Sequence, residues 1–120
     1  MMVVLVVEDS PLLADLMQQI LHSLDAEAVL AADVTSALHQ LERRSDITHV
    51  ITDLSLQDQD DGIELIDTIR RRWPRLPIIV TSGTSPPDTL PGDIPFMFKP
   101  YCITDLADWL TRLNGARSRP

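Results

Sequence analysis

Charged and hydroxyl side chains stand at the ends of four apolar segments of this sequence. Glu8 and Asp9 end "MVVLVVED", Asp53 closes "THVITD", Ser82 lies near the end of "PIIVTSG", and Lys99 ends "IPFMFK". Short, continuous apolar runs rich in Val and Ile are typical of strands covered on both faces. If these strands run parallel, their carboxyl ends meet at one edge of a sheet. Three carboxylates, a hydroxyl and an ammonium would then gather there.

Such a cluster of carboxylates needs compensation. Two carboxylates about 4–5 Å apart repel by roughly 3–4 kcal/mol at an effective dielectric constant near 20. The group must therefore take up a proton, pair with a cation, or hold a hard dication. Oxygen ligands without His or Cys favour Mg²⁺ or Ca²⁺ over zinc, and Mg²⁺ suits one or two carboxylates combined with phosphate and water. Because "DLSLQDQDDGIE" lacks the spacing of a calcium loop, we expect Mg²⁺.

Strand and helix patterns alternate along the chain. Apolar runs predict strands over 2–9, 26–33, 48–54, 77–83 and 94–99, and apolar periodicity predicts helices over 10–24, 34–44, 62–73 and 104–113. Ser10 suits the N-cap of the first helix, Pro11 its first position, and Thr104 the N-cap of the last helix. The first helix carries a broad apolar stripe, which consists of Leu12, Leu13, Leu16, Met17, Ile20, Leu21 and Leu24.

This alternation predicts an α/β fold with a doubly wound, five-stranded parallel sheet and helices on both faces. The connection between the fourth and fifth strands differs from the others, because it lacks a helical pattern and is rich in proline. We therefore expect the fourth helix to be short or absent. A ligand site in such a sheet lies outside the carboxyl ends of the strands, where the polar residues stand.

Each of these residues also has an ordinary structural interpretation. Asp9 could cap the first helix, Ser82 could form a turn before Gly83, and Lys99 could be a solvated surface lysine. Their collection at one edge of one predicted sheet favours a shared site over these separate roles.

Composition limits the classes of function. The formal net charge of −8 argues against non-specific binding to nucleic acid, which requires clustered Lys and Arg. A single cysteine, Cys102, excludes an internal disulfide and suits a reducing compartment. The longest apolar run, residues 1–7, is too short to span a bilayer. We expect one cytoplasmic domain over residues 1–120, with a flexible tail at 114–120 and no membrane association.

The motifs in chain order resemble the receiver domain of two-component response regulators, of the single-domain chemotaxis-regulator type. "VVED" is similar to the family's acidic pair, "VITDL" to its third strand, "DDGIELI" to the segment that opens its third helix, "IIVTSG" to its fourth strand and "FMFKP" to its fifth. The resemblance covers the chain from Val3 to about Leu113. It implies a flavodoxin-like sheet with strand order 2-1-3-4-5.

The resemblance also implies roles for particular residues. Asp53 would be the phosphoacceptor, and Lys99 would contact the phosphoryl group. Mg²⁺ would be held by Asp9, Asp53 and the backbone carbonyl of Ser55, with Glu8 acting through water. Ser82 and Phe96 would form the switch that responds to the phosphoryl group.

By this resemblance the partner is a sensor histidine kinase or a histidine phosphotransfer protein, and output passes by protein contact, with a weak dimer as one form. The chain would be a signalling switch that catalyses only its own phosphorylation and slow dephosphorylation. The connection from Ser82 to Lys99 departs from the family: its four prolines predict loss of the fourth helix, or one turn near residues 87–90.

Other functions remain as alternatives. A receiver attached to a hybrid kinase, or one that serves as a phosphate sink, would carry the same residues. A Mg²⁺-dependent phosphohydrolase with an aspartyl phosphate would need an acid two residues after Asp53, where Ser55 stands. A flavodoxin-like cofactor module would need a Ser/Thr/Gly-rich loop after the first strand, where the sequence is "EDSP".

Overall fold

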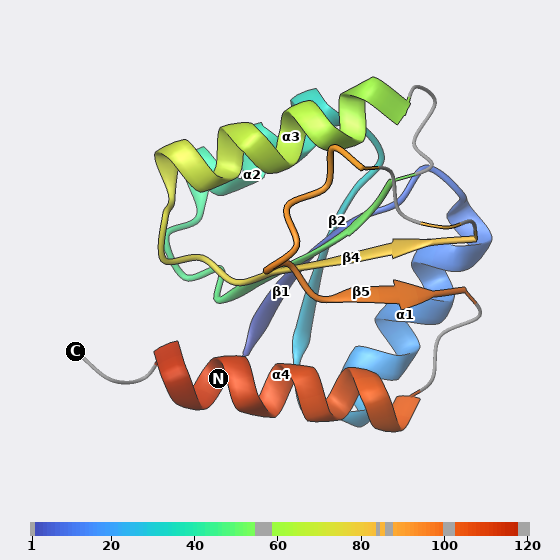
Figure 1. Cartoon of the computed structure of the whole chain (residues 1–120). Helices are drawn as coiled ribbons and strands as arrows, with labels where there is room; N and C mark the ends of the chain where they lie inside the picture. The colour runs from blue at the N-terminus through green and yellow to red at the C-terminus, as the bar shows by residue number, and fades with distance from the viewer. Residues whose placement is uncertain (1, 55–58, 84, 86–87, 100–102, 118–120) are drawn as a thin grey trace.

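The computed structural model describes residues 2–54, 59–83, 85, 88–99 and 103–117. Strands and helices alternate through most of the described chain (Figure 1). The strands are β1 (Val3–Val7), β2 (Glu27–Ala31), β3 (His49–Asp53), β4 (Ile78–Ser82) and β5 (Phe96–Phe98). The helices are α1 (Pro11–Ser23), α2 (Val34–Arg43), α3 (Gln59–Arg72) and α4 (Ile103–Arg117).

The five strands form one parallel sheet in the order β2-β1-β3-β4-β5. The predicted fold class and strand order are therefore confirmed. Every residue of β1, β3 and β4 is buried, because these strands lie inside the sheet with helices on both faces. This arrangement explains why their sequences read as continuous apolar runs rather than as alternating ones.

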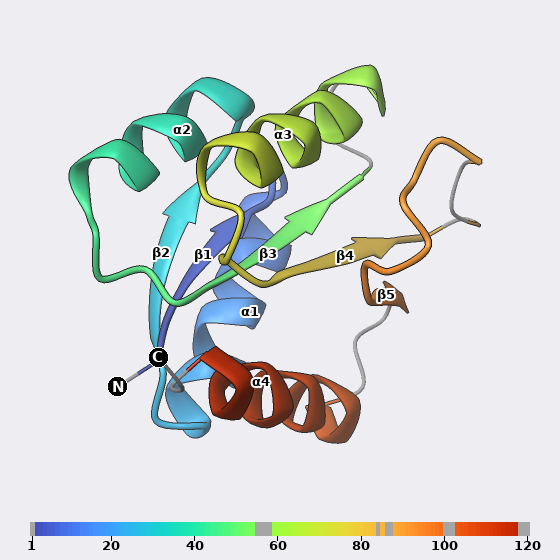
Figure 2. The same ribbon diagram turned by 60° about the vertical axis from the view of Figure 1, so that its left-hand side comes forward.

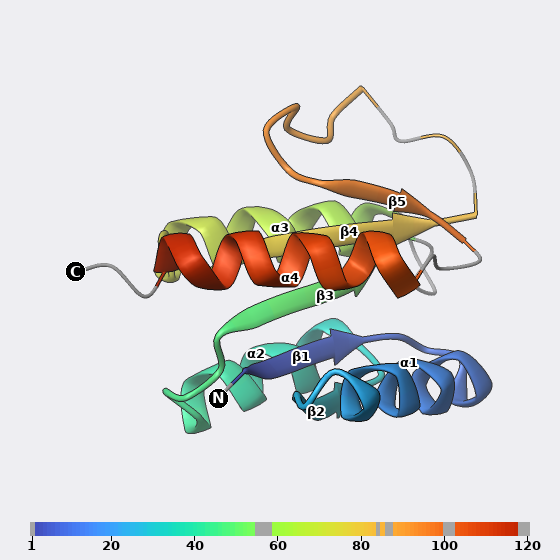
Figure 3. The same cartoon turned by 90° about the horizontal axis from the view of Figure 1, so that it is seen from below.

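The helices form two layers around the sheet. In Figures 1, 2 and 3, α2 and α3 cover one face, while α1 and α4 cover the other. Alternate residues of β1 divide between the two apolar cores: Val3, Leu5 and Val7 face α2 and α3, whereas Val4 and Val6 face α1 and α4. The period of two along a strand thus builds two cores from one sheet.

Two of the three predicted helix-start signals hold. The Ser10 hydroxyl accepts the Leu13 N–H of α1, and Pro11 occupies the first turn. Thr104, however, lies inside α4, which begins at Ile103, so its prediction as N-cap was wrong. Signals for a cap place a helix end only to within one or two residues. At its other end α4 continues to Arg117, four residues beyond the predicted end of this helix.

The apolar stripe of α1 is only partly buried. Met17, Ile20 and Leu21 pack against the sheet, whereas Leu12 and Leu16 are 78% and 44% exposed. The stripe is wider than the face that one helix can press against a sheet.

The connection between β4 and β5 contains no helix among its described residues. Instead, Leu90 and Ile94 pack against the core beneath α2 and α3. Arg70 of α3 holds this segment by a two-pronged ion pair with Asp93, with N–O distances of 2.8 and 3.0 Å. The described part of the chain holds no helix that is both long and apolar enough to cross a membrane.

Candidate functional site at the carboxyl ends of the strands

The sheet carries the predicted polar residues to one edge. Glu8 and Asp9 follow β1 directly, Asp53 and Ser82 are the last residues of β3 and β4, and Lys99 follows β5. These four strands are parallel, and their carboxyl ends point to the same side in Figure 1. Residues that are up to 91 positions apart in the sequence therefore contact one another.

Lys99 joins two of the acidic residues. Its ammonium donates to Oδ2 of Asp53 at 2.8 Å and to Oε1 of Glu8 at 2.9 Å. The Asp53 residue is 2% exposed and Glu8 is buried as well. Little water can therefore screen these charges. The positive charge of Lys99 offsets the negative charges of Asp53 and Glu8.

Asp9 completes an acidic group. One carboxylate oxygen from each of Glu8, Asp9 and Asp53 lies within 4.8 Å of the others. The donor set consists of oxygen alone, with two buried carboxylates and one half-buried one. This set fits Mg²⁺, which binds few protein carboxylates and fills its remaining positions with water or phosphate. Ser55, the fourth predicted ligand, lies outside the described residues.

The environment of Glu8 disfavours its negative charge. Burial raises the pKa of its carboxyl, and the nearby charge of Asp53 raises it further. The hydrogen bond from Lys99 acts in the opposite direction but does not cancel the effect of burial. A dication at this edge would offset the same repulsion.

Ser82 and Phe96 lie on the neighbouring strands β4 and β5. The backbone N–H of Lys99 donates to the Ser82 carbonyl at 2.9 Å, which ties the end of β5 to the end of β4. Phe96 is half-buried and packs against the core under α2 and α3. Ser82 thus ends β4 at the acidic edge, whereas Phe96 begins β5, two residues before the end of that strand.

Comparison with known proteins agrees with this arrangement. Residues 4–91 match the family described as the response regulator receiver domain. The chain belongs to the response regulator receiver domain family.

Individual relatives support this assignment. The chain is 34% identical over 82 residues to "Nitrogen assimilation regulatory protein NtrX" of Azorhizobium caulinodans, covering 67% of this chain and 18% of that protein. It is 32% identical over 81 residues to "Putative response regulator NtrX-like" of Rickettsia bellii, covering 67% of this chain and 17% of that protein. The chain therefore spans less than a fifth of the length of these curated relatives.

Solved structures show the same fold. A signal receiver domain of an HD domain-containing protein from Pseudomonas fluorescens superposes with a TM-score of 0.88 at 24% identity, covering 99% of this chain and 98% of that one. A sensor protein from Polaromonas superposes with a TM-score of 0.85 at 27% identity, covering 98% of both chains.

The glycine of the "DDG" segment has a packing role in this receiver domain. A Cβ at Gly62 would lie 3.2 Å from the Cα and the carbonyl oxygen of Leu54. Helix α3 therefore approaches the backbone directly after Asp53, more closely than is usual for a residue with a Cβ. This contact helps to fix the end of β3.

The sequence reasoning did not single out several residues around the site. Thr81 is the register partner of Asp53, and its hydroxyl is buried without a hydrogen-bond partner in the described residues. Phe98 is 57% exposed and contacts Phe96. Two features of the sequence pointed to these residues. Thr81 is a threonine within an apolar strand, and Phe98 is a second aromatic residue two positions after Phe96.

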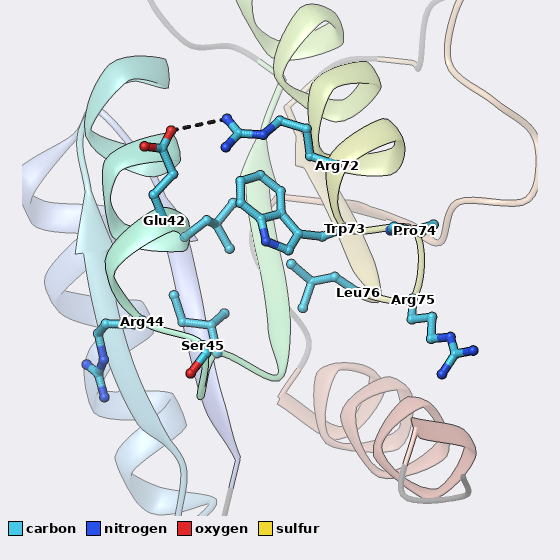
Figure 4. Close-up of a pocket in the computed structure, with 10 residues that line it drawn as sticks. Glu42, Arg44, Ser45, Arg72, Trp73, Pro74, Arg75 and Leu76 are labelled. Carbon is cyan, nitrogen blue, oxygen red and sulfur yellow. Dashed lines mark hydrogen bonds and ion pairs between the residues drawn. The ribbon is translucent and has the colours of Figure 1, made fainter.

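A groove of about 700 Å³ lies at the opposite end of the sheet, between the last turns of α2 and α3 (Figure 4). Arg44 and Arg72, which line the groove, already have acidic or aromatic partners. Arg72 pairs with Glu42 at 3.1 Å and stacks over the Trp73 ring, while Arg44 contacts Glu27 and Asp46. None of the predicted site residues lines this groove, so the chemistry of the receiver domain is to be sought at the acidic edge.

Proposed function

We propose that Asp53 accepts a phosphoryl group from a histidine kinase or a histidine phosphotransfer protein, and that this changes a surface for protein contact. The contact between Lys99 and Asp53 carries the proposal. A buried carboxylate at the end of a strand, with a movable cation 2.8 Å away, is placed to act as a nucleophile beside a positive charge. Membership of the receiver family supports phosphorylation-dependent signalling in a two-component system.

The transfer is a substitution at phosphorus. A carboxylate oxygen of Asp53 forms the new O–P bond, while the P–N bond to the donor histidine breaks and its imidazole leaves with the electron pair. The ammonium of Lys99 then turns from the carboxylate to an oxygen of the phosphoryl group. A compact cation with three donors on a flexible stem suits this movement. Positioning and charge stabilisation account for most of such a catalysis.

Mg²⁺ would be held by Asp9 and Asp53, with the carbonyl of Ser55 as a further ligand and Glu8 acting through water. When bound, it supplies positive charge to the phosphoryl oxygens during transfer. The oxygen-only donor set and the raised pKa of Glu8 both support a cation here. Asp53 then has two tasks, as ligand and as nucleophile.

The phosphoryl group brings roughly −1.5 to −2 units of charge and three acceptor oxygens. The Ser82 hydroxyl would turn toward it, and the Phe96 ring would fill the space that is left. This local change biases a surface at β4 and β5 between two packing states. The output of the domain would be the difference in partner affinity between these states.

Two exposed leucines support the proposal that the phosphoryl donor is a protein. Leu12 and Leu16 are one turn apart on α1, the helix that begins directly after Glu8 and Asp9. Residues at this spacing share one face of a helix. Since Leu12 is in the first turn, the pair lies next to the acidic edge, where an amphipathic helix that carries the donor histidine could pack.

The test is phosphoryl uptake from labelled acetyl phosphate with Mg²⁺, which needs no partner protein. The wild-type chain should take up the label, and Asp53→Asn should take up none. Asp67→Asn, which removes an exposed carboxylate of α3, is the matched control and should behave as the wild type. A labelled Asp53→Asn variant would disprove the assignment.

A further inference from the structure

The two phenylalanines of the chain contact each other on β5. Their ring centroids are 5.0 Å apart and their planes meet at 86°, which is an edge-to-face contact. They are two residues apart on one strand and so point to the same face of the sheet. Phe96 is half-buried against the core, whereas Phe98 is 57% exposed.

Phe98 also lies beside Ser82. In the pairing of β4 with β5, Phe98 is the register partner of Ser82 and Phe96 is the partner of Val80. Register partners in a parallel pair present their side chains on the same face, so Ser82, Phe96 and Phe98 share one face. The Phe98 ring thus stands next to both residues that we propose as the switch.

The connection between β4 and β5 lies between Ser82 and Phe96 in the chain. The described residues of that connection form no helix, and Leu90 and Ile94 pack against the core instead. On this face the Phe98 ring has solvent over more than half of its surface. Phe98 therefore borders both solvent and the Phe96 ring.

We propose that Phe98 is a positioning residue for Phe96: its ring holds Phe96 in the unphosphorylated arrangement and moves when Phe96 moves toward Ser82. This inference rests on the proposed function. Phe96 cannot approach Ser82 without altering its contact with Phe98, because Phe98 occupies the place beside Ser82. An edge-to-face pair changes a rotamer equilibrium by roughly two- to tenfold. The exposed ring thereby reports the state of the buried site at the surface.

The chain allows a direct test, since Phe96 and Phe98 are its only two phenylalanines. Incorporation of 4-fluorophenylalanine gives two fluorine NMR resonances, which Phe96→Leu and Phe98→Leu assign. Addition of Mg²⁺ with beryllium fluoride, as a stand-in for the phosphoryl group, should shift both resonances at the same ligand concentration. In Phe98→Ala the apparent affinity for beryllium fluoride should rise two- to tenfold.

Two variants distinguish the positioning role of Phe98 from a general effect of removing exposed apolar surface. Phe98→Tyr keeps the ring edge and should restore the wild-type affinity. Ile103→Ala removes an exposed apolar side chain at the start of α4 and should leave the affinity unchanged. Phe98 and Ile103 are each more than half exposed, so the variants at these two positions should fold.

The outcomes distinguish this inference from the proposed function. If the Phe98 resonance stays fixed while Phe96 responds, or if Phe98→Ala binds as the wild type does, the positioning role is wrong and the switch at Phe96 stands. If neither resonance responds but acetyl phosphate still labels Asp53, the positioning role is again wrong while the phosphoacceptor stands. If Asp53 takes up no phosphoryl group, the proposed function fails and this inference fails with it.

Discussion

The Lys99 ammonium reaches from the end of β5 to the Asp53 carboxylate at the end of β3, with 2.8 Å between Nζ and Oδ2. The same nitrogen lies 2.9 Å from Glu8. One cation thus connects two buried carboxylates, one at the end of β3 and one directly after β1. The contact with Asp53 spans the intervening strand β4. We expect the stability of the domain and its proposed chemistry both to depend on this contact.

Lys99→Ala should destabilise the domain in the absence of Mg²⁺. The substitution leaves Glu8 and Asp53 facing each other without their cation, and breaking a buried pair in this way costs about 3–5 kcal/mol in the free energy of unfolding. Mg²⁺ binding should be retained and should restore about 2.7 kcal/mol at a concentration one hundred times its Kd. Urea unfolding with and without Mg²⁺ measures both effects.

Arg112→Ala is the control for that experiment, because it removes an exposed cation that pairs with Asp108 on α4. Its cost should stay near 0.5 kcal/mol or less, as for exposed helical pairs generally. A Lys99→Ala variant as stable as Arg112→Ala would contradict the account of the charges. Lys99→Ala should also separate phosphorylation from partner binding, so a partner affinity that still rises on phosphorylation would refute the role of Lys99 in coupling.

Glu8→Gln should stabilise the Mg²⁺-free domain at neutral pH. Burial raises the pKa of Glu8 in the folded state. Between the unfolded and folded pKa values the folded chain therefore binds more protons than the unfolded chain, and stability falls as the pH rises through this window. Glutamine cannot ionise, so the variant does not lose stability in this way as the pH rises.

Thermal unfolding of the wild type and of Glu8→Gln from pH 4 to pH 8 tests whether the charge on Glu8 lowers the stability of the domain. The difference between the two should grow with pH and then level off above the folded pKa. Mg²⁺ should reverse the order, since only glutamate offers the cation a negative charge. A difference that shrinks as the pH rises would show that Glu8 is stabilised as the anion.

Leu12→Glu with Leu16→Glu should impair transfer from a protein donor and spare transfer from acetyl phosphate. The added charges oppose an apolar helix that packs on α1, whereas a small donor needs no such surface. We expect the rate from a histidine kinase to fall about tenfold or more, which corresponds to about 1.4 kcal/mol or more of lost contact. Gln18→Glu adds a charge to an exposed position of the same helix and serves as the control. Equal loss with both donors would point to damage at the site itself.

Gly62→Ala should destabilise the domain by about 1 kcal/mol. Alanine gains up to about 1 kcal/mol in helix propensity, but its Cβ would meet backbone atoms of Leu54 at 3.2 Å. Because backbone atoms cannot rotate away, overpacking of about 1–3 kcal/mol outweighs the gain. Thr68→Ala, at a half-buried position of the same helix, should be neutral or slightly stabilising. A more stable Gly62→Ala variant would show that the helix and Leu54 can separate freely.

The sequence allowed prediction of the sheet and of the acidic edge for one physical reason. Parallel strands bring their carboxyl ends together, so the polar residues that end the apolar runs had to meet. The approach of Glu8, Asp9, Asp53 and Lys99 followed from the strand order without any knowledge of side-chain rotamers. The proline-rich connection was likewise readable, because proline excludes a helix interior.

Other features depend on packing between distant segments and were not readable in this way. An apolar stripe does not show how much of it the sheet will cover, so the exposure of Leu12 and Leu16 could not be predicted from the sequence. The contact of Phe96 with Phe98 depends on rotamers that only the folded environment selects. The start of α4 at Ile103 was missed for a local reason, since Thr and Asp residues can stand in the first turn as well as before it.

The central claim is that Asp53 itself carries the phosphoryl group. The most direct measurement is to phosphorylate the chain with acetyl phosphate and Mg²⁺, reduce it with borohydride, and map the product by peptide mass spectrometry. Reduction of an aspartyl phosphate converts that residue to homoserine. The account predicts homoserine at position 53, and at no other aspartate. Homoserine at another aspartate, or an unmodified position 53 in a chain that has taken up phosphate, would contradict it.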